Sequence, residues 1–179
     1  MPLVKNTNKI KIKFVKREIS IFGICILDNG SLLAAGTESG HIILWDVKSQ
    51  KQQILSNRTE KVSAVAFGAG GLLYSSQGGM VHKWAADFSK VESTIKVESK
   101  KNEIYQIAVL NEQLVCASRK IKCYAGETLA FEWSGHTHPC VAVAATDEFL
   151  VSYGQDESSV TCWRANTEKA ECRFQITGK

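Results

Sequence analysis

One arrangement of residues recurs along this chain at a nearly constant interval, and it limits the fold more than any other feature. A short apolar segment ends in a large ring and is followed by a polar exit, first in GHIILWDVKSQK and then three more times. The rings are Trp45, Trp84, Tyr124 and Trp163, which are separated by 39, 40 and 39 residues. Self-similarity at about 40 residues is typical of chains built from repeated units that pack side by side.

Each period holds four segments whose hydropathy changes in the same order. A run that is apolar on both faces comes first, at residues 19–27, 62–67, 104–110 and 140–145. A second apolar segment, the ring-bearing segment and a mostly polar segment follow, and none of them shows sustained helical periodicity. A strand that is apolar on both faces needs cover on both sides, whereas a polar strand can face solvent. The sequence therefore predicts an all-β protein of four-stranded units, ordered from buried to exposed.

An isolated sheet of this kind cannot hide both of its faces, so we expect the units to stack around an axis as the blades of a β-propeller. The large ring of each unit fills the gap between neighbouring blades. We assign four blades, to residues 19–59, 60–102, 103–138 and 139–179. Residues 1–18 form a basic N-terminal arm, in which Ile10, Ile12 and Phe14 alternate with lysines as in an edge strand.

These repeats resemble the WD-repeat family of β-propellers over nearly the whole chain. The most specific features are Trp45-Asp46 and the fourth repeat, where Gly135-His136 places its histidine 27 residues before Trp163. The chain departs from the family in having one Trp-Asp pair, a tyrosine at 124 and a single repeat opened by Gly-His. The resemblance implies a WD40-type propeller whose four blades are the N-terminal part of a larger, seven-bladed ring. The strand in the N-terminal arm would then close the last blade.

The resemblance also implies structural roles for particular residues. The family's histidine bonds toward the tryptophan, a hydroxyl of the second strand and an aspartate of a tight turn. In this chain these residues are His136, Trp163, Ser152 and Asp156, and their role is a buried network that fixes one blade. The remaining structural positions are Trp45, Asp46, Trp84 and Tyr124.

Motifs that carry chemistry are missing from the sequence. It has neither a G-x-S-x-G nucleophile elbow nor a G-x-x-x-x-G-K-[ST] phosphate loop. The GAGG at 68–71 lacks the third glycine of a dinucleotide fingerprint and reads as a β-turn. His136 and His138 are half of a metal site at most, since no other pair stands at ligand spacing. We expect a protein that is not an enzyme and has no cofactor, no metal and no small-molecule substrate.

The six cysteines form no C-x-x-C pair and lie within apolar stretches, which favours reduced, buried thiols over a disulfide framework. If Arg119-Lys120 is a two-residue turn, Ser118 faces Ile121 and Cys116 faces Cys123 across the strands. We therefore expect Cys116 and Cys123 to be a small apolar pair.

Charge is distributed unevenly along the chain. Residues 1–20 hold six cations against Glu18, whereas the rest of the chain is nearly neutral. Lys9, Lys11, Lys13, Lys16 and Arg17 are candidate contacts for RNA phosphates. The alternative, which we favour, is that lysines on an outer strand prevent association between sheet edges. The N-terminus has no apolar signal region and no apolar run reaches membrane-spanning length, so we expect an intracellular protein without membrane contact.

These features favour a noncatalytic scaffold that holds other proteins in a large assembly. The third repeat, with its short turn between the second and third strands, resembles the WD-repeat subunits of the small-subunit processome. That resemblance implies a nucleolar role in pre-rRNA processing and small-subunit ribosome biogenesis, close to ribosomal RNA. Two alternatives stay open: a cytoplasmic adaptor for a ubiquitin ligase or signalling complex, and direct RNA binding through the basic arm.

Overall fold

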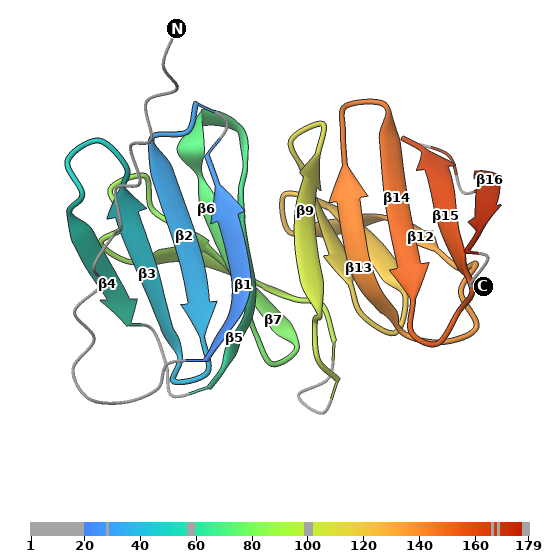
Figure 1. Cartoon of the computed structure of the whole chain (residues 1–179), viewed down its shortest axis with the longest axis horizontal. Helices are drawn as coiled ribbons and strands as arrows, with labels where there is room; N and C mark the ends of the chain where they lie inside the picture. Colours follow the sequence, from blue (N-terminus) through green and yellow to red (C-terminus); the bar gives the residue numbers. More distant parts are fainter. Residues whose placement is uncertain are drawn as a thin grey trace, which may run out of the picture.

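The computed structural model describes residues 20–27, 29–56, 60–98, 102–165, 167 and 169–176. The basic N-terminal arm, with its expected closing strand and candidate RNA contacts, lies outside these residues. Sixteen β-strands and one short 3-10 helix are described, and the strands form four antiparallel sheets (Figure 1). The all-β prediction is confirmed.

Each sheet is built from four consecutive strands, paired in chain order, and we call the sheets blades 1 to 4. Blade 1 consists of β1 (Ile21–Ile26), β2 (Leu32–Thr37), β3 (His41–Asp46) and β4 (Gln52–Ser56). Blade 2 consists of β5 (Val62–Phe67), β6 (Leu73–Gln77), β7 (Met80–Trp84) and β8 (Val91–Lys96). Blade 3 consists of β9 (Gln106–Leu110), β10 (Gln113–Ala117), β11 (Ile121–Ala125) and β12 (Thr128–Trp133). Blade 4 consists of β13 (Cys140–Ala145), β14 (Phe149–Gly154), β15 (Ser159–Arg164) and β16 (Ala170–Gln175).

The first strands of the four blades lie next to one another, so β1, β5, β9 and β13 line the inner side of the arrangement. The later strands of each blade run outward, as Figure 1 shows for β13 to β16. Strand β16, the outermost strand of blade 4, is exposed along its whole length. The buried-to-exposed order expected from hydropathy holds for β16 at the rim. It is wrong for β1, the innermost strand of blade 1, which is mostly exposed because no described blade covers its outer side.

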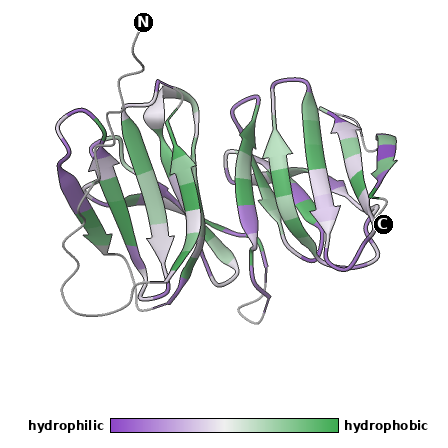
Figure 2. Ribbon diagram, in the orientation of Figure 1, coloured by the Kyte–Doolittle hydropathy of each residue, from purple (hydrophilic) through white to green (hydrophobic). Residues whose placement is uncertain are grey.

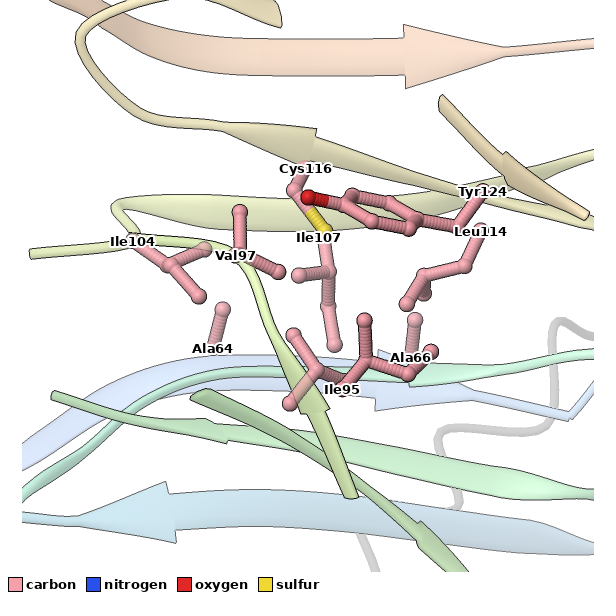
Figure 3. Packing of buried hydrophobic residues seen from close by; sticks show 10 residues of the cluster. Ala64, Ala66, Ile95, Val97, Ile104, Ile107, Leu114, Cys116 and Tyr124 are labelled. Atoms are coloured by element: carbon pink, nitrogen blue, oxygen red, sulfur yellow. The ribbon is translucent and has the colours of Figure 1, made fainter. Parts of the chain in front are cut away.

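Three apolar clusters fill the spaces between neighbouring blades. The cluster between blades 1 and 2 includes Ala34, Ile42 and Leu44 from one side and Leu73 and Trp84 from the other. The cluster between blades 2 and 3 is shown in Figure 3, where the Tyr124 ring lies with Leu114 and Ile107 against residues of blade 2. The cluster between blades 3 and 4 includes Trp133 and Trp163.

In blades 2 to 4 the ring at the end of the third strand faces the preceding blade. Trp84 packs toward blade 1, Tyr124 toward blade 2 and Trp163 toward blade 3, and each is less than a tenth exposed. Opposite the rings, on the second strands, Leu33 pairs with Trp45, Leu114 with Tyr124 and Leu150 with Trp163. The rings thus occupy equivalent places in successive sheets, which is the arrangement that their spacing predicts.

The sequence prediction for the turn between β10 and β11 is wrong by one residue. In the structure Ala117 pairs with Ile121, Cys116 with Lys122 and Val115 with Cys123, because the connection has three residues rather than two. A shift of one residue moves a side chain to the other face of a sheet. Cys116 consequently packs between blades 2 and 3, and Cys123 packs between blades 3 and 4. They are not cross-strand partners.

Two local details depend on register and on turn geometry. Simple alternation along residues 91–97 would place Val91 on the same face as Ile95 and Val97, but a bulge between Lys83 and Trp84 shifts the pairing of β7 with β8. Val91 therefore packs toward blade 1, whereas Ile95 and Val97 pack toward blade 3. The GAGG connection holds a 3-10 helix at Ala69–Gly71, with Gly70 and Gly71 at positive φ. It remains a connection between two strands, as the turn interpretation requires.

Candidate protein-interaction surfaces and the network that supports them

Blade 4 is held by a chain of hydrogen bonds around its ring. The Trp163 indole donates from Nε1 to Ser152 Oγ over 2.7 Å, and His136 Nε2 lies 2.7 Å from the same oxygen. His136 Nδ1 lies 2.5 Å from Glu157 Oε2. Because a carboxylate only accepts, Nδ1 carries the proton, and Nε2 of a neutral imidazole accepts from the Ser152 hydroxyl. The structure therefore brings His136, Ser152 and Trp163 together in one network.

The carboxylate of this network is Glu157 rather than the expected Asp156. Asp156 occupies the turn itself, with φ at 57°, and the next residue carries its side chain back to His136. A Glu157 oxygen also accepts from the backbone N–H of Thr137 over 2.7 Å. Burial raises the pKa of Glu157, but these hydrogen bonds, led by the one from His136, outweigh it and lower the pKa to about 2. Glu157 is a residue that sequence reasoning missed.

The same position on the second strand differs from blade to blade. Ser75 of blade 2 accepts from Trp84 Nε1 over 3.0 Å, just as Ser152 does in blade 4. Counting from the leucine opposite the ring, the equivalent residue is Cys116 in blade 3 and Ala35 in blade 1. Cys116 is fully buried beside Tyr124 (Figure 3). Burial raises the pKa of Tyr124 to about 12, so its hydroxyl stays protonated.

A hydrogen-bonded ion pair joins blades 2 and 3 beside their apolar cluster. Lys122 Nζ of β11 donates over 2.9 Å to Glu98 Oε1, which follows β8, and the Ser118 hydroxyl donates to the same oxygen. The side chains of Lys122 and Glu98 are only 16% and 11% exposed. Burial raises the pKa of Glu98, but the bonds from Lys122 and Ser118 outweigh it and lower the pKa overall. The ion pair and the Ser118 hydrogen bond fix the two blades relative to each other.

Trp133 is the largest core residue that the sequence analysis overlooked. It lies at the end of β12, opposite Ile121, and donates from Nε1 to the Thr167 carbonyl of blade 4 over 2.6 Å. The fourth segment of each repeat is mostly polar in the sequence, so the pattern does not predict a buried ring on this strand. The spacing of Phe131 and Trp133, two residues apart on one strand face, was the available signal.

Blade 1 presents its ring to an open groove instead of to another described blade. Trp45 is half-buried and lines a groove of about 260 Å³ together with Ile21, Ile24, Leu33 and Ala35. Its neighbour Asp46 accepts a hydrogen bond of 2.7 Å from the Ser49 backbone N–H, which together with the Ser49 hydroxyl lowers the pKa of Asp46. Trp45 and Asp46 therefore lie at the edge of an uncovered surface.

This surface continues over the whole sheet. Ile24, Ala35, Ile43 and Ile54 are successive cross-strand partners, so they form one row on the same face. Ile24 is 66% exposed and Ile54 is 57% exposed. Figure 2 shows the hydrophobic composition of β1, the innermost strand of this blade. We call this side of the sheet, with Ile24, Ile26, Leu33, Trp45 and Ile54, the open face of blade 1.

Blade 4 has an uncovered side at the other end of the described structure. Val151 and Phe174 are 37% and 61% exposed, whereas Val115 and Trp133, their counterparts in blade 3, are buried against blade 4. We call this side, with Val151, Cys162, Cys172 and Phe174, the open face of blade 4. The described residues therefore carry two apolar sheet faces that no other described sheet covers, and exposed apolar patches of this kind are surfaces on which other chains or further sheets pack.

The hydrogen bonds of His136 restrict its use as a catalytic or metal-binding residue. Both of its ring nitrogens are engaged in the network, and His138 is exposed and bonded through Nδ1 to the Thr137 hydroxyl over 3.0 Å. Among the described residues, no group of three His, Cys, Asp or Glu side chains is placed to hold a metal ion. None of the helical structure in that part of the chain is long and apolar enough to cross a membrane.

Comparisons with known proteins identify the fold. No protein-family model and no curated protein matches the sequence. In contrast, 1248 solved chains match the structure, so the fold is a common one that does not by itself specify a function. One of them is a chain from the crystal structure of a mitotic checkpoint complex, with a TM-score of 0.76 and 17% sequence identity over 88% of this chain.

The match covers 52% of that solved chain, so the present chain spans about half of its length. At 17% identity the likeness shows the fold alone. The four radial sheets are those of a WD40-type β-propeller, as the resemblance of the repeats implies.

Proposed function

We propose that this chain is a noncatalytic WD-repeat scaffold that binds other proteins within a multiprotein assembly. The observation that carries the proposal is the open face of blade 1, where the exposed Ile24, Ile26 and Ile54 lie around a groove lined by Trp45. Three covered faces of the same molecule show what such a ring-bearing side packs against. The likeness to a chain of a mitotic checkpoint complex supports a role in an assembly.

We propose that a β-sheet of a partner protein, presenting small and branched apolar side chains, covers this face. A further blade of a larger ring is the competing occupant, and protection of β1 and β4 in the chain without a partner would identify it. At the interface of blades 1 and 2, the ring of Trp84 is covered by Ala34, Ile42, Leu44 and Leu55, which all lie on one side of one sheet. Trp45 occupies the same place in its own blade, is half-buried, and shares its groove with described residues of its own sheet. A partner sheet of similar composition would bury the exposed isoleucines in the same way.

The test uses the full chain and a pair of matched variants. Ile24→Asp combined with Ile54→Asp places two charges on the open face of blade 1, whereas Leu129→Asp changes a leucine that is 47% exposed on the rim of blade 3. Burying an unpaired carboxylate is costly, so we expect the double variant to lower partner binding about tenfold or more. Leu129→Asp should bind as the wild type does.

Hydrogen exchange then identifies the surface that the partner covers. Protection of β1 and β4 in the isolated complex supports the proposal, because these strands carry the exposed isoleucines. Equal binding by both variants, or protection confined to other strands, would contradict it. A self-associated dimer of the chain that protects the same strands would replace the partner protein with a second copy.

The specific version of this proposal is a nucleolar scaffold for pre-rRNA processing and small-subunit ribosome biogenesis. Its support is the resemblance of the third repeat to WD-repeat subunits of the small-subunit processome. Nucleolar enrichment and co-purification with processome subunits are the expected results. A diffuse cytoplasmic signal with ubiquitin-ligase or signalling subunits would favour the adaptor alternative and remove the nucleolar proposal.

Direct RNA binding through the N-terminal arm is the second candidate. The supporting observation is its charge, six cations against one anion in residues 1–20. Replacement of Lys9, Lys11 and Lys13 by glutamate should weaken RNA binding in a filter assay and reduce its salt dependence. Unchanged RNA affinity in this variant would eliminate the candidate without affecting the scaffold proposal.

A further inference from the structure

Two cysteines face each other directly on the open face of blade 4. Cys162 of β15 and Cys172 of β16 are cross-strand partners in the antiparallel register. Within the residues that the structure describes, no other two cysteines are paired in this way: Cys25 is opposite Ala34, Cys116 opposite Lys122, Cys123 opposite Phe131 and Cys140 opposite Gly154. Directly opposed residues place their side chains on the same side of the sheet.

The alternation along β15 fixes which side this is. Thr161 and Trp163 are buried toward blade 3, so Cys162 between them points to the open face. Cys172 is exposed and Cys162 is half-buried. In blade 3 the equivalent positions hold Cys123 and Phe131, which blade 4 covers. The thiol pair is therefore reached from solvent at a position that is closed in the preceding blade.

The spacing of opposed residues suits a covalent bond between the two sulfurs. Cα atoms of directly opposed residues in antiparallel strands are about 4.5–5.5 Å apart. A disulfide spans Cα separations of about 4.4–6.8 Å, so the spacing of an opposed pair is compatible with a disulfide here, next to the bulge that shifts the pairing between Cys162 and Trp163. We propose that Cys162 and Cys172 are a redox-active dithiol, which a small-molecule disulfide such as glutathione disulfide oxidises to a disulfide between β15 and β16.

The exchange proceeds in two balanced steps. The exposed Cys172 thiolate attacks one sulfur of the small disulfide, forms a mixed disulfide and releases one small thiol. Cys162 then loses its proton to solvent and attacks the Cys172 sulfur, which releases the second small thiol. Two electrons pass from the protein dithiol to the small disulfide, so one disulfide is consumed and one is formed. An excess of the small thiol reverses both steps.

The other thiols are poorly placed for this chemistry. Burial raises the pKa of Cys25 to about 12 and the pKa of Cys140 to about 11, so neither supplies thiolate near neutral pH. Burial likewise raises the pKa of Cys123 to about 11, and Cys116 is fully buried. Burial and the neighbouring Cys172 both raise the pKa of Cys162, which assigns the first attack to the exposed partner.

The disulfide would change the rim of blade 4. Strand β16 is exposed along its whole length and pairs with β15 on one side, as the outermost strand of its sheet. A covalent bond at Cys172 would fasten its middle to β15 and remove two thiols from the open face. This inference goes beyond the scaffold proposal and does not depend on it, because it requires only the geometry of one hairpin and solvent access to the open face of blade 4.

The experiment treats the full chain with glutathione disulfide, blocks remaining thiols and maps the products by mass spectrometry. In the wild type we expect a peptide linked through Cys162 and Cys172, with Cys25, Cys116, Cys123 and Cys140 still free. In Cys162→Ser the second step is lost, so the glutathione adduct at Cys172 should accumulate at least about tenfold over its wild-type level. In Cys172→Ser neither product should form at these two positions.

The two variants are also expected to fold as stably as the wild type. Both substitutions lie on a solvent-facing side, so the free energy of unfolding should stay within about 0.5 kcal/mol of the wild type. A wild type that accumulates the Cys172 adduct as Cys162→Ser does would overturn the proposal, since the second step would then not occur. A linked peptide that joins any other two cysteines would overturn it as well.

Discussion

Trp163 and Trp45 stand at the same place in two blades, and their surroundings could hardly differ more. Trp163 of blade 4 is 2% exposed, packs against blade 3 and donates its indole hydrogen to Ser152. Trp45 of blade 1 is half-buried and lines a groove, and the residue equivalent to Ser152 is Ala35. One ring is built into the structure, whereas the other is left at its surface.

The difference teaches that a repeat fixes the position of a residue and not its role. The role follows from what lies on the far side of the ring and from whether a hydroxyl is available to accept its indole hydrogen. Blade 2 confirms the second point, because Ser75 accepts from Trp84 in a blade that has a neighbour on both sides. The hydrogen bond accompanies burial, as expected where an unpaired indole would be costly.

The largest test of this comparison is to remove each ring. Trp163→Ala leaves a cavity between blades 3 and 4 and should lower the free energy of unfolding by about 3–5 kcal/mol. Trp45→Ala removes a ring with one covered side and should cost about half as much or less. Denaturant unfolding of the full-length variants measures both values. Equal losses would show that Trp45 is buried by a part of the chain that the structure does not describe.

The second test concerns the charge of Glu157. Glu157→Gln keeps the shape but weakens the bond to His136, and we expect a loss of about 1.5–3 kcal/mol near neutral pH. The pKa of Glu157 in the folded state, about 2, lies below its ordinary value of 4.5, so its stabilising contribution is complete above pH 4.5. The contribution falls as the pH drops from 4.5 toward 2, and the variant should approach the wild type there. A difference that is independent of pH would contradict the ionised state.

A third test breaks only the hydrogen bond that distinguishes the two blades. Ser152→Ala leaves Trp163 Nε1 and His136 Nε2 without the hydroxyl and should cost about 1–3 kcal/mol. Ser75→Ala in blade 2 removes one such bond rather than two and should cost less. Thermal or denaturant unfolding of both variants gives the order. A larger loss for Ser75→Ala would mean that His136 contributes nothing to the network.

The smallest expected effect comes from adding to blade 1 the hydroxyl that blade 4 has. Ala35→Ser places a hydroxyl at the position that Ser152 occupies in blade 4, close to the indole of Trp45. Because the groove is open, the indole already reaches water, and the net change should lie within about 1 kcal/mol. The indole N–H resonance of Trp45, assigned by comparison with Trp45→Ala, should shift in the variant. An unchanged resonance would show that the hydroxyl does not reach the ring.

The sequence predicts the fold well because its signal is redundant. Four rings at nearly equal spacing, each preceded by two apolar strands, leave an all-β radial arrangement as the consistent interpretation. The individual contacts are harder to predict because each depends on one residue of register. The β10–β11 connection is one residue longer than expected, which separates Cys116 from Cys123. Similarly, in the tight turn near Asp156, Glu157 rather than Asp156 supplies the carboxylate that bonds to His136.

Other residues escape prediction for a different reason. Trp133 lies on a strand whose equivalents are polar, and its burial depends on blade 4 covering it. The Cys162–Cys172 pair is visible in the sequence only once the register of β15 with β16 is known. The RNA contacts proposed for the basic arm stay a prediction, since Lys9, Lys11, Lys13, Lys16 and Arg17 lie outside the described residues.

The interfaces between the blades, here called seams, determine how the molecule unfolds locally. Most contacts between sheets join neighbours in chain order, and the seam between blades 2 and 3 adds the Lys122–Glu98 ion pair to its apolar cluster. Stability in such an array is a sum of units and seams. Thermal fluctuations should therefore detach an outer blade while the central pair stays intact, so damage at one end need not spread to the other.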